Sequence, residues 1–217
     1  MRWIHILTAC SLLAELVPRV DATFDTRPTL VACSAESGAW QTAGASDAVI
    51  LIRTPFGALT VCLDHDLAPT AVHNLLDAAR RRVQGRFERA EARPEIPDAP
   101  EGPYALLQGT FDDTLMSMPQ EGTSTTIRAG DLVLIPHTWS FYIALENHDT
   151  WATAHSVIGS VTHLTVVDAI VIQSTHEFVH PEYRTTMRML DDPVHFELTT
   201  DLTDIAMIPI SHHVTTV

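Results

Sequence analysis

The chain has 217 residues, 46% of them hydrophobic, which suits one domain with a substantial core and is too short for two ordinary domains. Its 13 basic residues are all arginine and stand against 27 acidic residues, so that the net charge is −14. This charge repels phosphate backbones and argues against nucleic acid as a partner, and the lack of lysine excludes phosphate-loop and Schiff-base chemistry.

The first 22 residues have the layout of a secretory signal peptide. Arg2 precedes an apolar stretch from Ile4 to Val17, and we expect cleavage near Ala22. An uncleaved amphipathic segment is the alternative, because Glu15 interrupts the stretch. The stretch is shorter than the roughly 20 apolar residues that a bilayer needs, so no stable membrane insertion is expected. The chain is therefore predicted to enter the secretory pathway, as a secreted or ER-lumenal protein.

Residues 23–46 read as a flexible linker, because Ala, Ser, Thr and Gly dominate residues 32–46 without a strand or helix period. The folded domain is expected over residues 47–200, with a C-terminal tail at 201–217. Cys33 and Cys62 remain after signal cleavage, and an oxidising compartment would allow them to form a disulfide. Cys62 lies in an alternating apolar stretch, which favours its interpretation as a small buried hydrophobic residue.

The domain opens with two β-rich runs at residues 48–53 and 58–63. The turn residues Pro55 and Gly57 lie between them, which predicts a hairpin. A helix follows from Ala68-Pro69 to about Arg82, because apolar residues recur at helical spacing and proline suits a first turn. The residues expected on its buried face are Val72, Leu75, Leu76 and Ala79.

The rest of the domain contains more short apolar runs. These runs predict strands at residues 104–108, 132–135, 141–145, 157–161 and 195–199, and a short helix at 166–172. Many short strands with two helices are typical of a mainly β protein that forms a closed antiparallel barrel.

Seven segments, in order along the chain, resemble the cyclophilins. The hairpin turn at 54–57 is followed by Ala-Pro-x-x-Val-x-Asn-Leu at 68–75. Further matches are Phe87-Glu88-Arg89, Leu106-Leu107-Gln108-Gly109, Ser140-Phe141-Tyr142-Ile143, the Trp-to-Gly segment 151–159 and Val166-Val167-Asp168-Ala169-Ile170. The resemblance covers residues 48–172 and is closest to divergent secretory-pathway cyclophilin-like proteins. It implies an eight-stranded antiparallel barrel capped by two α-helices, closed by the strand near His195.

The resemblance also implies peptidyl-prolyl cis-trans isomerase activity on X-Pro bonds of secretory-pathway or extracellular proteins. Rotation about such a bond faces a barrier of about 18–20 kcal/mol, which a guanidinium directed at the prolyl nitrogen lowers by favouring the twisted amide. By resemblance Arg89 is this catalytic group and Gln108 holds it. The substrate-binding residues implied are Phe87, Leu106, Ile135, Phe141, Tyr142, Trp151 and His155. The resemblance implies no cofactor, Pro-containing polypeptides as partners and a monomeric chain.

Each of these residues also has a plain structural interpretation. Arg89 lies among Glu88, Glu91 and other charged residues and would then be an exposed, ion-paired arginine. Tyr142 and Trp151 would be core aromatics whose polar atoms are satisfied, and His155 a hydrogen-bonded structural histidine.

The sequence departs from the family at several positions in this region. Ala105 replaces a large aromatic residue, Tyr142 replaces phenylalanine and Ser140 replaces glutamine, which predicts a wider and more polar pocket. A proline-rich insertion at residues 91–103 separates Arg89 from Gln108. These departures support an alternative function, a catalytically inactive module that binds Pro-containing segments or a partner protein.

Other enzyme classes find little support. The sequence contains 12 histidines, but no pair lies on a predicted helix with a third ligand at a suitable spacing, so no metal site is expected. The adjacent acids Asp112-Asp113 and Asp191-Asp192 are interpreted as turn residues, not as an acid and base pair. The histidines that gather toward the C-terminus are His176, His180, His195, His212 and His213.

Overall fold

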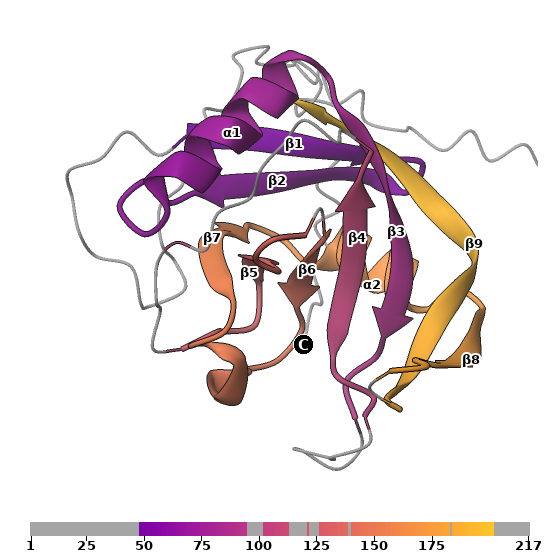
Figure 1. Cartoon of the computed structure of the whole chain (residues 1–217). Coiled ribbons are helices and arrows are strands. Elements are labelled where there is room, and N and C mark those ends of the chain that lie inside the picture. Colours follow the sequence, from indigo (N-terminus) through magenta and orange to yellow (C-terminus); the bar gives the residue numbers. More distant parts are fainter. Residues whose placement is uncertain are drawn as a thin grey trace, which may run out of the picture.

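Nine β-strands and two α-helices are present in the part of the chain that the computed structural model describes, residues 48–94, 102–112, 121, 126–138, 140–182 and 184–201 (Figure 1). The strands are β1 (Ala48–Thr54), β2 (Gly57–Leu63), β3 (Gln84–Glu91), β4 (Leu106–Phe111), β5 (Asp131–Leu134), β6 (Ser140–Ala144), β7 (Ser156–Val161), β8 (Thr175–Val179) and β9 (Thr186–Thr199). The predicted signal peptide, linker and tail beyond residue 201 lie outside the described residues and stay predictions.

The predicted hairpin is confirmed. β1 and β2 pair antiparallel from Ala48 opposite Leu63 to Thr54 opposite Gly57. In the turn, the hydroxyl of Thr54 accepts a hydrogen bond from the Phe56 amide at 3.1 Å. Gly57 has a φ of 129°, a conformation that side chains with a Cβ rarely adopt, so glycine is required at this corner.

The strands form a closed barrel. Among the described strands the order is β1-β2-β7-β5-β6-β4-β3-β9-β8, and β9 also pairs with β1, at Leu51 opposite Thr199. This pairing closes a ring of eight antiparallel strands, which leaves β8 outside the ring as a partner of the first part of β9. The predicted mainly β, eight-stranded barrel is thereby confirmed.

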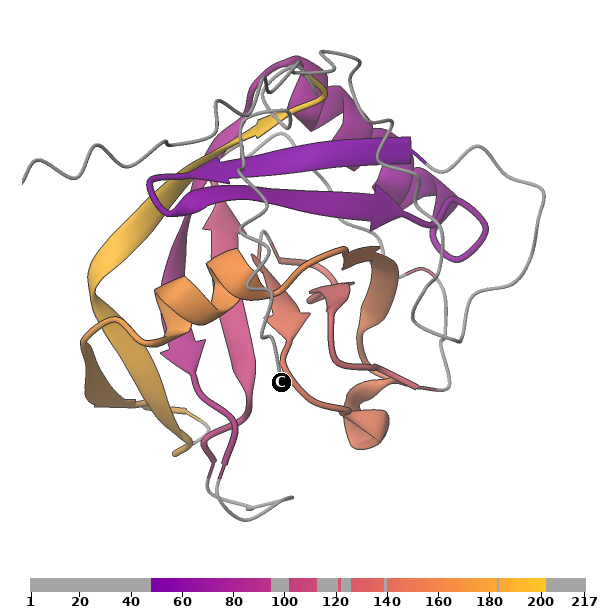
Figure 2. The ribbon, with the colours of Figure 1, turned by 180° about the vertical axis from the view of Figure 1, so that it is seen from behind.

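Two helices cover the barrel. α1 (Pro69–Arg80) contacts β1 and β9 and buries Val72, Leu75 and Ala79 as predicted, whereas Leu76 is only partly buried. α2 (Thr165–Val171) contacts β2, β3 and β4 and lies in front of the strands in Figure 2. No helix among the described residues combines the length and the hydrophobicity needed to cross a bilayer.

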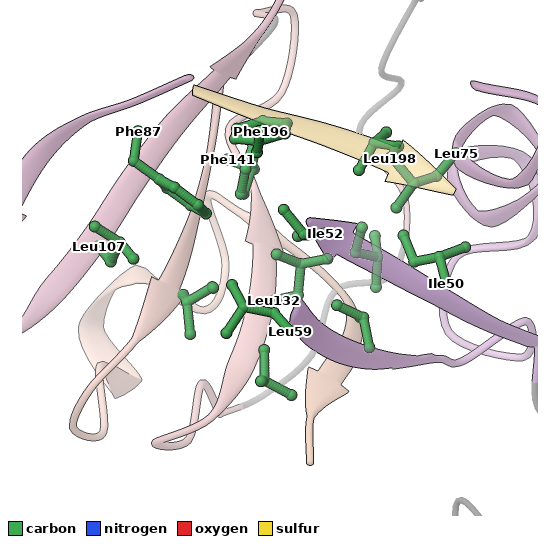
Figure 3. Packing of buried hydrophobic residues seen from close by; sticks show 14 of the residues in the cluster. Ile50, Ile52, Leu59, Leu75, Phe87, Leu107, Leu132, Phe141, Phe196 and Leu198 are labelled. Carbon is green, nitrogen blue, oxygen red and sulfur yellow. The ribbon is translucent and has the colours of Figure 1, made fainter. Parts of the chain in front are cut away.

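The core is divided between the inside of the barrel and one patch of its outer face. On β6, Phe141 and Ile143 point inward while Tyr142 and Ala144 point outward, as alternation along a strand requires. Figure 3 shows the inner cluster, in which aromatic and aliphatic side chains from several strands meet. The outer cluster consists of Leu106, Ile127, Val133, Tyr142, Ala144, Ala152 and Val157.

Cys62 is disulfide-bonded, and its partner lies outside the described residues. The preference for a free, small hydrophobic side chain at this position was therefore wrong. The strand alternation that supported that interpretation does not distinguish a thiol from a disulfide sulfur.

Asp131, at the start of β5, carries a buried carboxyl group. The side chain is 3% exposed and accepts a hydrogen bond from the Arg128 amide at 2.7 Å. Burial raises the pKa of Asp131 from its ordinary 3.8 to about 6, against the opposing effect of the Arg128 amide and charge. The folded state therefore holds this proton more tightly than the unfolded state, so that folding stability is lost as the pH rises from about 4 through 6.

Asp131→Asn removes this penalty and keeps an oxygen that accepts from the Arg128 amide. We expect the variant to be more stable than the wild type by about 3 kcal/mol at pH 7 and nearly equal to it in stability at pH 4. Urea unfolding of both proteins at the two pH values measures the difference. Equal stability at pH 7 would contradict the burial penalty.

Candidate active site

A pocket of about 320 Å³ opens on the outer face of the barrel, above the outer cluster. Its lining combines one cation, one amide, three large aromatic rings and aliphatic side chains. The lining residues are Arg89, Tyr104, Leu106, Gln108, Ile135, Tyr142, Trp151, His155 and Thr185.

Three neighbouring strands supply one transverse row of this pocket. Arg89 on β3 lies opposite Gln108 on β4, and Gln108 lies opposite Tyr142 on β6. Residues that face each other across antiparallel strands point to the same side of the sheet. The three side chains therefore meet on the outer face although 53 positions separate the first from the last in the chain.

A β-bulge at Glu88 explains why Arg89 faces outward. Phe87 points into the barrel, and regular alternation would send residue 89 to the same side. The register of β3 shifts between Phe87 and Arg89 against both β4 and β9, so the extra residue reverses the alternation. As a result Ala90 is the next inward residue and Arg89 reaches the pocket.

The guanidinium of Arg89 is held on two sides. Its Nε donates to Oε1 of Glu91 at 2.7 Å, and its Nη1 donates to Oε1 of Gln108 at 3.2 Å. The Arg89 side chain is 13% exposed and its guanidinium carbon lies 5.5 Å from the centre of the Tyr104 ring. The guanidinium therefore has a fixed orientation at the pocket wall, unlike a solvent-exposed surface arginine.

Another part of the pocket lining is aromatic. Trp151, at the end of the short 3-10 helix Asp149–Trp151, lies edge-on to Tyr142 with ring centres 5.8 Å apart, and it stacks on His148 at 4.3 Å. The Tyr142 hydroxyl and Nδ1 of His155 are 3.0 Å apart, so each satisfies the other and the wall presents largely apolar surface. Burial raises the pKa of Tyr142, and the Asp131 charge raises it further.

The structure places two of the predicted site residues elsewhere. Phe87 and Phe141 are 0% exposed and belong to the inner core, where their rings meet edge to face at 5.7 Å. They are not among the side chains that line the pocket. The pocket does contain Arg89, Gln108, Leu106, Ile135, Tyr142, Trp151 and His155.

Sequence reasoning missed two lining residues, Tyr104 and Thr185. Tyr104 precedes β4 and its ring lies 5.8 Å from Trp151, so an aromatic ring lines this side of the pocket although Ala105 supplies none. Thr185 belongs to the connection between β8 and β9, for which the sequence analysis predicted no structure. The one signal that the sequence offered was an aromatic residue, Tyr104, shortly before the segment Leu106-Leu107-Gln108.

Acidification should weaken ligand binding through His155. Burial lowers the pKa of His155 below its ordinary 6.5, and the charge of His148 lowers it further, so the ring is neutral at pH 7. Protonation would add a second cation to the pocket lining and leave Nδ1 able only to donate, so that the Tyr142 hydroxyl would have to accept. For the proline peptide that the family resemblance implies as a ligand, we expect the affinity to be lower at pH 5 than at pH 7. An NMR titration should show a flat profile for His155→Asn, whose oxygen still accepts from Tyr142; a parallel decline would exclude His155 as the cause.

No family model and no curated protein matches this chain.

Proposed function

We propose that the chain is a cyclophilin-like peptidyl-prolyl cis-trans isomerase that acts on X-Pro bonds of secretory-pathway or extracellular polypeptides. The observation that carries the proposal is the fixed guanidinium of Arg89 at the edge of an apolar, aromatic pocket. Support also comes from the closed eight-stranded barrel and from the ordered segments that resemble the family.

The pocket has the chemistry that a prolyl ring needs. Leu106, Ile135 and Tyr142 offer apolar surface, and burial of a small ring against such surface contributes about 25 cal/mol per Å². The volume of about 320 Å³ lies at the lower end of the range for small-ligand pockets, which suits one side chain and its flanking peptide bonds. A proline side chain is therefore the proposed occupant.

Arg89 would act on the peptide bond of that proline. In the planar amide the nitrogen lone pair is delocalised into the carbonyl, which creates the rotational barrier. When the bond twists the lone pair returns to nitrogen, and a guanidinium N–H directed at it then donates a hydrogen bond that the planar form does not accept. The interaction favours the transition state over the ground state, which is the condition for catalysis.

Within the described residues the hydrogen bonds of Arg89 engage Nε and Nη1, so Nη2 is the donor that we assign to the substrate. Gln108 has two proposed tasks, because its oxygen accepts from Arg89 while its amide N–H₂ is a donor for a substrate carbonyl. No bond is made or broken and no proton is transferred in this step.

Exchange NMR on a short X-Pro peptide tests the proposal. The wild-type chain should speed the exchange between cis and trans signals in a saturable manner, whereas the peptide with Ala in place of Pro should neither broaden nor shift. Broadening without faster exchange would replace the isomerase by the alternative function, a module that binds Pro-containing segments. Absence of both effects would refute both functions.

A further inference from the structure

The carboxylate of Glu91, the last residue of β3, is nearly inaccessible to solvent, since Glu91 is 1% exposed. Removing a carboxylate from water is costly unless donors replace the lost hydration. A carboxylate at this depth therefore needs several hydrogen-bond donors. The segments that supply these donors are the segments that Glu91 connects.

Three donors, from three separate segments, converge on Glu91. Oε1 accepts from Arg89 Nε at 2.7 Å and from the Arg188 amide at 3.3 Å. Oε2 accepts from the Tyr104 amide at 2.6 Å. The segments are β3 itself, the residues that precede β4 and the first part of β9.

Each donor bears on the pocket. The bond to Nε, together with Gln108 on Nη1, fixes the plane of the Arg89 guanidinium. The bond to the Tyr104 amide places the Tyr104 ring against that guanidinium. The bond to the Arg188 amide attaches β9 a few residues after Thr185, which is the pocket residue contributed by the β8–β9 connection.

We propose that Glu91 is a positioning residue that fixes the Arg89 guanidinium and joins to it the Tyr104 segment and the β8–β9 hairpin. The kinetic consequence rests on the proposed isomerase function, while the positioning itself applies to any ligand of the pocket. A glutamine at this position would not replace the carboxylate. Its one oxygen cannot accept from the donors to Oε1 and from the donor to Oε2 at the same time, and its NH₂ group would face an N–H donor.

The first test measures the Arg89 Nε–H of the wild-type chain by NMR. A buried, hydrogen-bonded proton exchanges with water only through local opening, so its exchange should be at least about tenfold slower than that of Arg86. Arg86 is a matched control on the same strand, with 40% of its side chain exposed. Arg89→Lys and Arg86→Lys assign the two signals by deleting them. Equal exchange rates would overturn the proposal.

The second test compares Glu91→Gln with Glu88→Gln, which removes the same charge from a partly exposed position on the same strand. In Glu91→Gln we expect the kcat for the X-Pro peptide to fall about tenfold or more, with the KM nearly unchanged, because the guanidinium is displaced and the apolar walls remain. The Arg89 Nε–H should also lose its protection. Glu88→Gln should change neither quantity, and an unchanged kcat in Glu91→Gln would refute the positioning role.

Glu91→Asp covers the case in which the glutamine variant does not fold. It keeps both oxygens on a side chain shorter by one methylene and should show an intermediate loss of kcat at an unchanged concentration of peptide-binding sites. A loss of binding sites at an unchanged kcat would mean a merely structural role. If the wild type does not speed exchange, the proposed function fails. The exchange of the Arg89 Nε–H in the wild type and in Glu91→Gln then still decides this inference.

Discussion

Under the proposed isomerase function, replacing Arg89 by alanine should lower the kcat for X-Pro isomerisation by about 10²-fold to 10³-fold, the usual cost of one lost electrostatic donor at a developing charge. The affinity for the peptide should change by only a few fold, because Leu106, Ile135 and Tyr142 form the apolar walls and remain in place. Exchange NMR at saturating peptide gives kcat, and line broadening in a titration gives the affinity.

Two companion variants make this result specific. Arg86→Ala removes an exposed arginine of the same strand, paired with Asp112 at 3.0 Å, and should leave kcat unchanged. Arg89→Lys keeps a cation beside the buried Glu91 but lacks the fork of N–H donors, so it should fold well and still lose most of the kcat. If Arg89→Lys or Arg89→Ala retained the wild-type kcat, the electrostatic mechanism would be wrong.

Strands rich in apolar residues were predictable from the sequence. In β1 and β2 the apolar residues are dense and the turn has its own signature in Pro55 and Gly57, so the hairpin could be placed to within a residue. The same applies to β5, β6 and β7, which bury both faces against the inner and the outer cluster. Short segments rich in apolar residues were enough to locate them.

The missed strands lack a clear apolar pattern of their own. β3 reads Gln-Gly-Arg-Phe-Glu-Arg-Ala-Glu, and its one large apolar residue, Phe87, produces no alternating pattern. β8 is exposed along most of its length and pairs with the first part of β9. Because most residues in this part of β9 are exposed or only partly buried, only the end of β9 was predicted. Asp191 and Asp192 accordingly lie within β9, and their interpretation as turn residues was wrong.

The sequence predicted residues of the candidate site mainly where they lie in segments resembling the family. Arg89, Gln108 and Tyr142 came from segments that resemble a family, but their meeting depends on cross-strand register and on the bulge at Glu88. Local sequence does not encode a bulge whose position is set by two partner strands. From the sequence, Glu91 was interpreted only as a charged neighbour of Arg89. Its burial could not be predicted, because its partners Tyr104 and Arg188 are brought to it only in the closed barrel.

Phe141 provides the second large effect, on stability. Its ring is 0% exposed and lies 4.6 Å from the ring centre of Phe111, where the two rings stack, and 5.7 Å from those of Phe87 and Phe196. Phe141→Ala should lower the free energy of unfolding by about 3–5 kcal/mol, since the barrel interior cannot close around the missing ring. Urea unfolding measures this loss, and Phe141→Leu, which keeps most of the volume, should lose about 1.5 kcal/mol or less.

The same variants decide whether Phe141 belongs to the core or to the binding surface. Tyr142, its neighbour on β6, points the opposite way, so the pocket wall should survive in the folded molecules. We expect Phe141→Leu to bind the X-Pro peptide with wild-type affinity at a temperature where it is fully folded. A weaker affinity in that variant without any loss of stability would mean that Phe141 contacts the peptide. Lower stability with unchanged affinity would mean that the inward face of β6 supports the fold while its outward face serves the pocket.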